Sequence, residues 1–273
     1  MSTSQFPFYL AGLIEGDGHF YSPARHRTNK GNTLYPSIQI CFALKDLPLA
    51  QMVLAHLGHG SLCRTSGKQA YILTVIDREG CVALVHMING KLRTSKCHQF
   101  SRFLTCLNER GYGNFVVGPK DTSPVFSNAW LAGFIEAAGC FEIRCTLTPP
   151  RRISPSFVIE QAYSHEEDRP LFTTISKSFL APEPRIIQRK GKGEFWRIRT
   201  TSLAGNLCLL QYLKECSLAG AKYMDFRDWC QVVEMVREKK HLMDASFPIV
   251  LAIKKDFNDA RTTFDWTHLK TFF

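Results

Sequence analysis

The chain has no run of apolar residues that approaches the roughly 20 needed for a membrane-spanning helix. We therefore expect no membrane partner. The first of the motifs described below begins eight residues after Met1. That spacing leaves no room for a signal or transit peptide, so we expect the protein to act where it is made or after removal of a precursor segment.

None of the ten cysteines forms a CxxC pair, and most of them lie in apolar stretches. This pattern is typical of reduced, buried thiols in a reducing compartment. It also argues against a structural zinc site, which usually uses paired cysteine or histidine ligands. His56 and His59 form an HxxH pair, but no third ligand accompanies them in the sequence.

Acidic residues are scarce, with 24 Asp and Glu against 34 Lys and Arg, which gives a net charge of +10. Such an excess favours a polyanionic partner, with nucleic acid as the first candidate and an anionic membrane surface as the second. A basic protein without any polyanionic partner is the alternative. The length of 273 residues fits one large domain or two ordinary ones.

One stretch occurs twice. Residues 9–20 read YLAGLIEGDGHF and residues 130–141 read WLAGFIEAAGCF, at an offset of 131 − 10 = 121. The two copies agree in character at almost every position. The exception is the place where the first copy has Asp17 and the second has Ala138.

The same order of elements follows each copy: a hairpin, a helix, a second hairpin and two helices. We predict an N-terminal lobe over 1–108, a linker over 109–127 that is rich in Gly, Pro and Ser, and a second lobe over 128–243. Residues 244–273 form a C-terminal extension without a clear pattern. Asp46 and Asp77 are expected to cap the helices that follow them, and Ser164 with Glu167 is expected to form a capping box.

Duplication implies two similar lobes about a pseudo-two-fold axis, which suits a nearly symmetric ligand such as duplex DNA. The small residues Ala11 and Gly12 predict close packing of the first motif helix against the second copy. Glu15 and Asp17 fall near the end of that helix, where carbonyl groups gather. Two such ends side by side predict a two-metal site for Mg²⁺, able to hydrolyse phosphodiesters.

LAGLIEGDG and LAGFIEAAG resemble the two signature helices of a single-chain LAGLIDADG homing endonuclease or of its intron maturase relatives. The resemblance covers about residues 6–242. It implies an α+β fold of two αββαββα lobes that form a saddle of antiparallel sheets, with the motif helices packed at the lobe interface. It also implies a monomer that is encoded in an organelle, a mitochondrion or a chloroplast, and that uses divalent metal at the helix junction.

In this family the metal ligand is the acidic residue before the last glycine of the motif, which maps to Asp17 and to Ala138. Because alanine cannot bind metal, we expect impaired cleavage, ranging from strand-selective nicking to binding alone. Glu136 should point away from the junction, and Glu142 is a weak substitute ligand. Resemblance further implies a catalytic lysine in each half, which maps to Lys96 and Lys222, and a water-orienting residue at Gln161 that Leu44 does not match.

Nucleic-acid contacts are expected from polar side chains that alternate along the strands, away from the apolar side. Arg151 and Arg152 follow two prolines and are expected to contact phosphates. The whole predicted set is Tyr21, Arg25, Arg27, Lys30, Gln39, Arg64, Lys68, Arg144, Arg151, Arg152, Arg185, Gln188, Arg189, Arg197 and Arg199.

Two functions compete. The first is a site-specific, Mg²⁺-dependent DNA endonuclease whose cleavage is impaired at Ala138. The second is a maturase, an RNA-binding splicing cofactor for a group I intron, which needs no catalytic carboxylates. A structural RNA-binding protein recruited from the same fold is a third, more remote interpretation.

Overall fold

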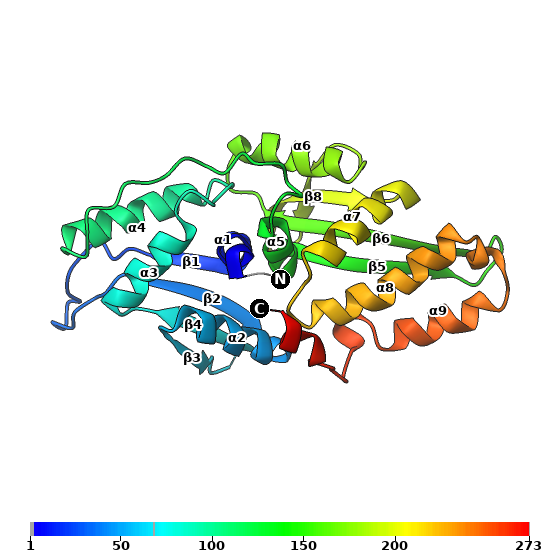
Figure 1. Cartoon of the computed structure of the whole chain (residues 1–273), viewed down its shortest axis with the longest axis horizontal. Helices are drawn as coiled ribbons and strands as arrows, with labels where there is room; N and C mark the ends of the chain where they lie inside the picture. The colour runs from blue at the N-terminus through cyan, green and yellow to red at the C-terminus, as the bar shows by residue number, and fades with distance from the viewer. Residues whose placement is uncertain (1–2, 68, 273) are drawn as a thin grey trace.

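The computed structural model describes residues 3–67 and 69–272. Within these residues, no helix is long and apolar enough to cross a membrane. The two halves repeat one order of elements along the chain (Figure 1). In the first half these are α1 (Phe6–Asp17), β1 (Gly18–Tyr21), β2 (Ser37–Ala43), α2 (Leu47–Leu57), β3 (Ser61–Arg64), β4 (Ala70–Val75), α3 (Arg78–Ile88) and α4 (Cys97–Glu109).

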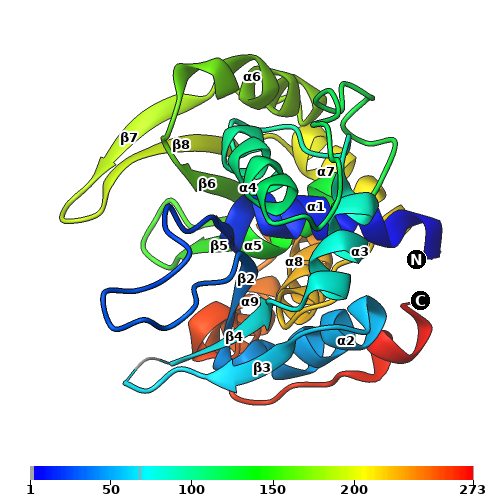
Figure 2. The same ribbon diagram turned by 90° about the vertical axis from the view of Figure 1, so that its left-hand side faces the viewer.

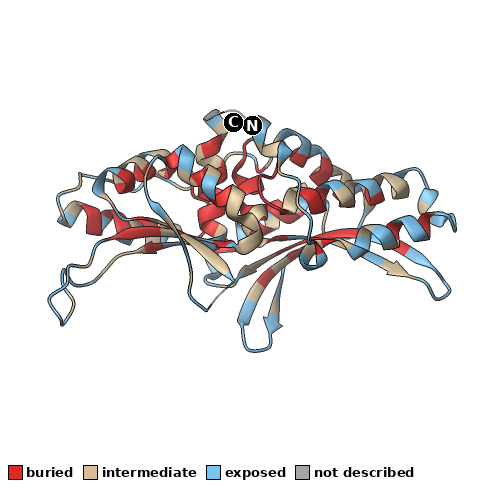
Figure 3. Ribbon diagram, turned by 90° about the horizontal axis from the view of Figure 1, so that it is seen from below, coloured by how far each residue is buried: buried red, intermediate tan, exposed pale blue. Residues whose placement is uncertain are grey.

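The second half contains α5 (Trp130–Ala138), β5 (Gly139–Thr146), β6 (Arg152–Ala162), α6 (Arg169–Ser178), β7 (Arg185–Arg189), β8 (Gly193–Thr200), α7 (Leu203–Glu215) and α8 (Lys222–Arg237). Its antiparallel sheet has the order β5-β6-β8-β7, which matches β1-β2-β4-β3 in the first half. The helices lie on one side of both sheets, and the hairpins project to the other (Figure 3). The predicted α+β fold of two αββαββα lobes is confirmed.

The two motif helices, α1 and α5, lie side by side at the centre of the molecule (Figures 1 and 2). Their backbones are in direct contact. A Cβ atom added to Gly12 would lie 1.9 Å from the carbonyl oxygen of Trp130, and one added to Gly133 would lie 1.9 Å from that of Tyr9. Only glycine fits at either position, which confirms the predicted close packing.

Side chains alternate between a buried and an open face along the strands. In β8, Trp196, Ile198 and Thr200 are buried, whereas Arg197 and Arg199 lie on the opposite face. The period of two therefore separates the core, under the helices, from a polar face turned away from it.

Several predicted helix starts differ from those observed. Asp77 does cap α3, by accepting a hydrogen bond from the Gly80 amide at 2.7 Å. Asp46 makes no such bond within α2. Ser164 and Glu167 form no capping box, because a 3₁₀ turn, η3 (Glu166–Asp168), precedes α6. Residues 91–96 form a loop that ends where α4 begins.

The linker is tied to the first lobe. The guanidinium of Arg93 contacts the carboxylate of Asp121 at 2.6 Å, and the Asp121 amide donates to the Leu92 carbonyl at 2.8 Å. Both partners of the ion pair are nearly inaccessible to solvent. The linker between the lobes is therefore held in place by the first lobe.

The C-terminal extension packs on the second lobe through α9 (Ser246–Lys255) and then returns to the centre, where both termini lie close together (Figures 1 and 2). Arg261 is buried and pairs with Asp225 and Asp228 at 3.0 and 2.5 Å. The ring of Phe272 lies 5.8 Å from that of Tyr9. These contacts secure the tail across both lobes.

Candidate active site at the motif-helix junction

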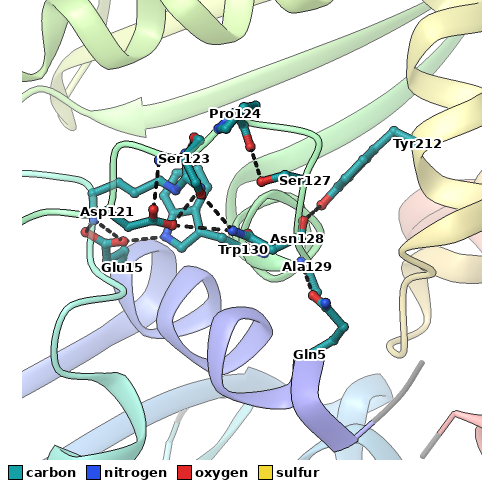
Figure 4. A network of polar contacts seen from close by, with 11 residues as sticks. Gln5, Glu15, Asp121, Ser123, Pro124, Ser127, Asn128, Ala129, Trp130 and Tyr212 are labelled. Atoms are coloured by element: carbon teal, nitrogen blue, oxygen red, sulfur yellow. Dashed lines mark hydrogen bonds and ion pairs between the residues drawn. The ribbon is translucent and has the colours of Figure 1, made fainter.

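The glutamate of the first motif, Glu15, is a structural group. Its buried carboxylate accepts hydrogen bonds from the amides of Arg93 and Thr94 and from the Thr94 hydroxyl, at 2.6–3.0 Å. It also accepts one from the indole N–H of Trp130 at 2.5 Å (Figure 4). Burial raises the pKa of Glu15, although these donors favour its charged form. Glu15 therefore holds the loop before α4 and is not available at the junction surface.

Glu136, the matching residue of the second motif, has the same role. It accepts hydrogen bonds from the Tyr9 hydroxyl at 2.9 Å and from the Ala219 amide at 2.8 Å. Ala219 lies in the loop that precedes α8. Because its carboxylate is occupied in this way, Glu136 does not replace the acid that is missing at Ala138.

Two aspartates form hydrogen bonds across the lobe interface to the loops that precede α4 and α8. Asp46 of the first lobe accepts a hydrogen bond from the Ala221 amide of the second at 2.7 Å. Asp168 of the second lobe accepts bonds from the amide and hydroxyl of Ser95 in the first, at 2.6 and 2.7 Å. The prediction that Asp46 caps the helix after it is thus wrong, because its carboxylate accepts from an amide of the other lobe instead.

Lys96 and Lys222 lie at equivalent places, one at the end of each motif helix. The Lys96 ammonium donates to the carbonyls of Ile14 and Gly18 at 3.0 and 2.7 Å. Lys222 donates to those of Ile135 and Glu136 at 2.9 and 2.7 Å. A cation there complements the negative end of a helix dipole. Burial lowers the pKa of both lysines.

The carbonyl groups of Ile14, Gly18, Ile135 and Glu136 are therefore bonded to ammonium groups. Asp17 remains. It is the last residue of α1 and lines a cleft of 290 Å³ with Asp46 and Lys222. Within residues 3–67 and 69–272, no hydrogen bond or ion pair satisfies its exposed carboxylate. Desolvation raises the pKa of Asp17 and outweighs the opposing effect of the two lysines.

Ala138 occupies the corresponding end of α5. Glu142 accepts hydrogen bonds from Arg199 at 2.7 Å and from Ser156 at 3.1 Å, which fix it on the open face of the second sheet. A free carboxylate is a suitable ligand for a hard divalent cation that keeps most of its water. The described residues thus fit one cation at Asp17 and offer no matching ligand at Ala138.

Gln161 and Lys96 come from different lobes and line one cleft of 480 Å³, beside Asp168. His98, Arg102 and His165, which we did not predict, line the same cleft. A repeated pattern does mark the two bridging aspartates, because Asp46 and Asp168 each stand two residues before a proline, at an offset of 168 − 46 = 122. That offset nearly equals the offset of the motifs.

Strand register places the predicted nucleic-acid contacts. On the second sheet Arg185 pairs with Arg197, so both lie on the open face with Arg199. Gln188 pairs with Glu194 and so lies on the opposite face, which faces the core. Arg64 also lies on the core-facing side of its sheet, because it pairs with Tyr71, which pairs with the buried Phe42. The open faces carry Tyr21 and Gln39 on the first sheet and Arg144, Arg152, Arg185, Arg189, Arg197 and Arg199 on the second.

Loops carry others of the set. Arg25, Arg27 and Lys30 lie between β1 and β2 and are exposed. Arg151 pairs with Asp244 at 2.6 Å, and Arg152 is the first residue of β6. Lys68 lies outside the described residues.

Acidic side chains on the second sheet hold some of these arginines. Glu160 contacts Arg189 at 2.6 Å and Arg197 at 3.3 Å. Because these pairs remain partly open to solvent, they orient the guanidinium groups more than they stabilise the fold.

Comparison with known proteins identifies the family. A family model described as LAGLIDADG endonuclease matches residues 10–107 and 131–233, so this chain belongs to the LAGLIDADG endonuclease family. Among its relatives, the intron-encoded DNA endonuclease aI3 of Saccharomyces cerevisiae is 26% identical over 298 residues, which span 96% of this chain and 72% of that protein. The intron-encoded RNA maturase bI4 of the same yeast is 34% identical over 139 residues, 50% of this chain and 19% of that protein.

Solved structures share the fold. The meganuclease I-SmaMI, bound to uncleaveable DNA, superimposes with a TM-score of 0.72 at 20% identity, over 93% of this chain and 99% of that one. The LAGLIDADG homing endonuclease I-GzeII, in complex with its DNA target, gives a TM-score of 0.69 at 17% identity, over 94% and 99%.

Proposed function

We propose that the chain is a site-specific DNA-binding protein of the homing-endonuclease type whose double-strand cleavage is impaired. The observation that carries this proposal is the asymmetry of the junction. Asp17 presents a free carboxylate at the end of α1, whereas Ala138 presents a methyl group at the end of α5. One strand of a duplex would meet a complete metal site, and the other would not.

Mg²⁺ held by Asp17 would supply charge stabilisation and lower the pKa of bound water. The chain's own side chains would then position charge next to the phosphate. Lys222 shares the cleft of Asp17, and its ammonium is fixed by two carbonyls, so it is placed to stabilise charge on a phosphate. Lys96 and Gln161 line the other cleft, where the carboxylates of Glu15 and Asp168 are already bound by hydrogen bonds to backbone and side-chain donors.

DNA recognition is assigned to the open faces of the two sheets. Arginines that share one face of adjacent strands are suited to phosphates and to the major-groove edges of guanine. The solved relatives named above are described as bound to DNA. The proposal includes a monomer, because both lobes are in one chain, and an organelle as the place of action, which rests on the family resemblance.

The test begins with selection of a bound duplex from a random library, followed by its insertion into a supercoiled plasmid. With Mg²⁺, the wild type is expected to nick this plasmid or leave it intact. Ala138→Asp restores the second acid and should raise the rate of double-strand cleavage on the order of 10³-fold.

Asp17→Asn in the Ala138→Asp background is the matched control and should lose that gain. Efficient linearisation by the wild type would show that Ala138 does not impair cleavage. Nicking by the wild type that persists in Asp17→Asn would exclude Asp17 as the metal ligand.

A maturase is the second candidate. It is favoured by the 34% identity to the RNA maturase bI4 over half of the chain, together with the absence of an acid at residue 138. Group I intron RNA would then be the partner, and no Mg²⁺ at Asp17 would be required. Competition decides between the two: a structured intron RNA that displaces duplex DNA, and whose splicing the chain accelerates, would establish the maturase.

A further inference from the structure

A group of metal-binding side chains lies outside the motif-helix junction, where the two lobes meet. Cys97 and His98 begin α4 of the first lobe, and Glu167 lies in η3 of the second. The sulfur of Cys97, a ring nitrogen of His98 and a carboxylate oxygen of Glu167 all lie within 4.8 Å of one another. Three different ligand types thus converge from two lobes.

Their spacing is close to that of a coordination shell. The Nε2 atom of His98 lies 2.8 Å from Oε1 of Glu167. Tetrahedral zinc bonds of about 2.0–2.3 Å place neighbouring ligand atoms roughly 3.3–3.7 Å apart, so shifts of a few tenths of an ångström between these two suffice. The ring of His165 stands 5.7 Å from that of His98 at an angle of 69° and offers a fourth donor.

We propose that Cys97, His98 and Glu167, with His165 or water as the fourth ligand, bind a borderline-soft divalent cation such as Zn²⁺ and thereby clamp the two lobes. Thiolate and imidazole select such ions over Mg²⁺, which prefers oxygen alone. The site is therefore chemically distinct from the one at Asp17, and it does not depend on the proposed nuclease activity. Binding releases the thiol proton of Cys97 to water, which makes it stronger as pH rises.

One charged side chain near this cluster, Lys120, competes with a metal ion for the Glu167 carboxylate. The ammonium of Lys120 lies 3.1 Å from Oε1 of Glu167 and therefore competes with a metal ion for this oxygen. Lys120 is about a third exposed, so its flexible stem can move the ammonium into water. Burial raises the pKa of the Cys97 thiol; the ammonium of Lys120 opposes this rise, and the carboxylates of Glu167, Glu15 and Asp168 add to it. The same carboxylates favour a cation beside the thiol.

The solvent exposure of the cluster and its location between the lobes also fit a metal ion that joins the two lobes. His98 and Glu167 are 53% and 41% exposed, so an ion reaches them directly from solvent. The cluster adjoins Lys96 on one side and the Ser95–Asp168 hydrogen bonds on the other. A bound ion would add a coordinate bridge where these bonds already join the lobes.

Co²⁺ is the probe, added to chelator-treated protein without nucleic acid. The wild type should develop a near-ultraviolet thiolate-to-cobalt charge-transfer band and visible bands of tetrahedral cobalt, both removed by Zn²⁺. Cys97→Ser should abolish the charge-transfer band. His98→Gln and Glu167→Gln should each weaken Co²⁺ binding by about 10- to 100-fold. Cys63→Ser, which removes an exposed thiol from β3, is the matched control and should bind like the wild type.

Lys120→Ala removes the competing ammonium and should tighten binding, a result that general loss of folding cannot produce. The proposal is overturned if the wild type shows no charge-transfer band, or if the band survives in Cys97→Ser. It is equally overturned if His98→Gln and Glu167→Gln bind as the wild type does, because a lone thiol would then account for the signal.

Discussion

At the scale of single residues, two acids of the first motif have separate roles although they stand only two positions apart. Glu15 is buried and accepts hydrogen bonds from four donors, whereas Asp17 faces solvent without a partner among the described residues. The second motif keeps the structural acid, Glu136, and lacks the free one. The acid that holds neighbouring loops is thus present in both motifs, and the acid absent at Ala138 corresponds to the one that has no such role in the first.

The raised pKa of Asp17 predicts a pH dependence for divalent-cation binding. A proton and a cation compete for the same carboxylate, and desolvation keeps the proton bound to a higher pH than in a free aspartate. As the pH is lowered, affinity for Mn²⁺ should consequently begin to fall at a higher pH than the ordinary pKa of aspartate would give. Calorimetric titrations at a series of pH values check it.

Asp17→Asn serves as the control for that series and should bind Mn²⁺ weakly at every pH. A wild-type affinity that begins to fall only near the ordinary pKa of aspartate would contradict the desolvation argument. Cys97→Ser is a second control, because it removes the sulfur ligand of the proposed lobe clamp from the titration.

The residues of the motif predicted an acid at Asp17, and the family resemblance predicted a lysine in each half, at Lys96 and Lys222. The partners of Glu15 and Asp46 were not predictable in this way. Ala221 is 175 residues from Asp46, and no local pattern distinguishes a cap within one helix from a cap across a lobe interface. The period-two pattern did place Arg197 and Arg199 on one face. It could not show that Gln188 and Arg64 lie on the other face, because that depends on how their strands pair with the neighbouring strands.

At the scale of elements, α1 and α5 form the joint on which the rest of the molecule depends. Gly12→Ala would place a methyl group 1.9 Å from a backbone oxygen, which the partner helix can relieve only by moving away. We expect the free energy of unfolding to fall by about 3 kcal/mol or more, as measured by urea denaturation.

Gly191→Ala provides the matched control for this substitution. Gly191 has a φ of +72° and open space around its Cβ position, so only backbone strain of about 1 kcal/mol is expected there. Equal effects at the two glycines would show that the helix–helix contact is not the reason for the glycine at residue 12.

At the scale of the whole molecule, net charge and shape together predict how binding responds to salt. The chain carries a charge of +10, and its arginine-rich sheet faces lie away from the helices. If 6–10 phosphates are contacted, affinity for duplex DNA should fall by about 10³- to 10⁵-fold between 50 and 200 mM salt. Fluorescence anisotropy with a labelled duplex measures this slope.

Arg185→Ala and Arg197→Ala, which remove a facing pair, should lower the slope by about one unit for each phosphate that is no longer neutralised. Arg237→Ala, on the helical side, should leave it unchanged. A slope near zero in the wild type would contradict electrostatic binding by the open faces.

The bridging aspartates have a consequence for synthesis of the chain. Ser95 must wait until Asp168 has left the ribosome, 73 residues later, before its amide and hydroxyl are satisfied, and Asp46 must wait for Ala221. The N-terminal lobe is therefore incomplete while it is a nascent chain, with the face of α1 that receives α5 still open to water. Its final folding is set by translation of the second lobe, and slow codons between the lobes would prolong the interval in which chaperones are needed.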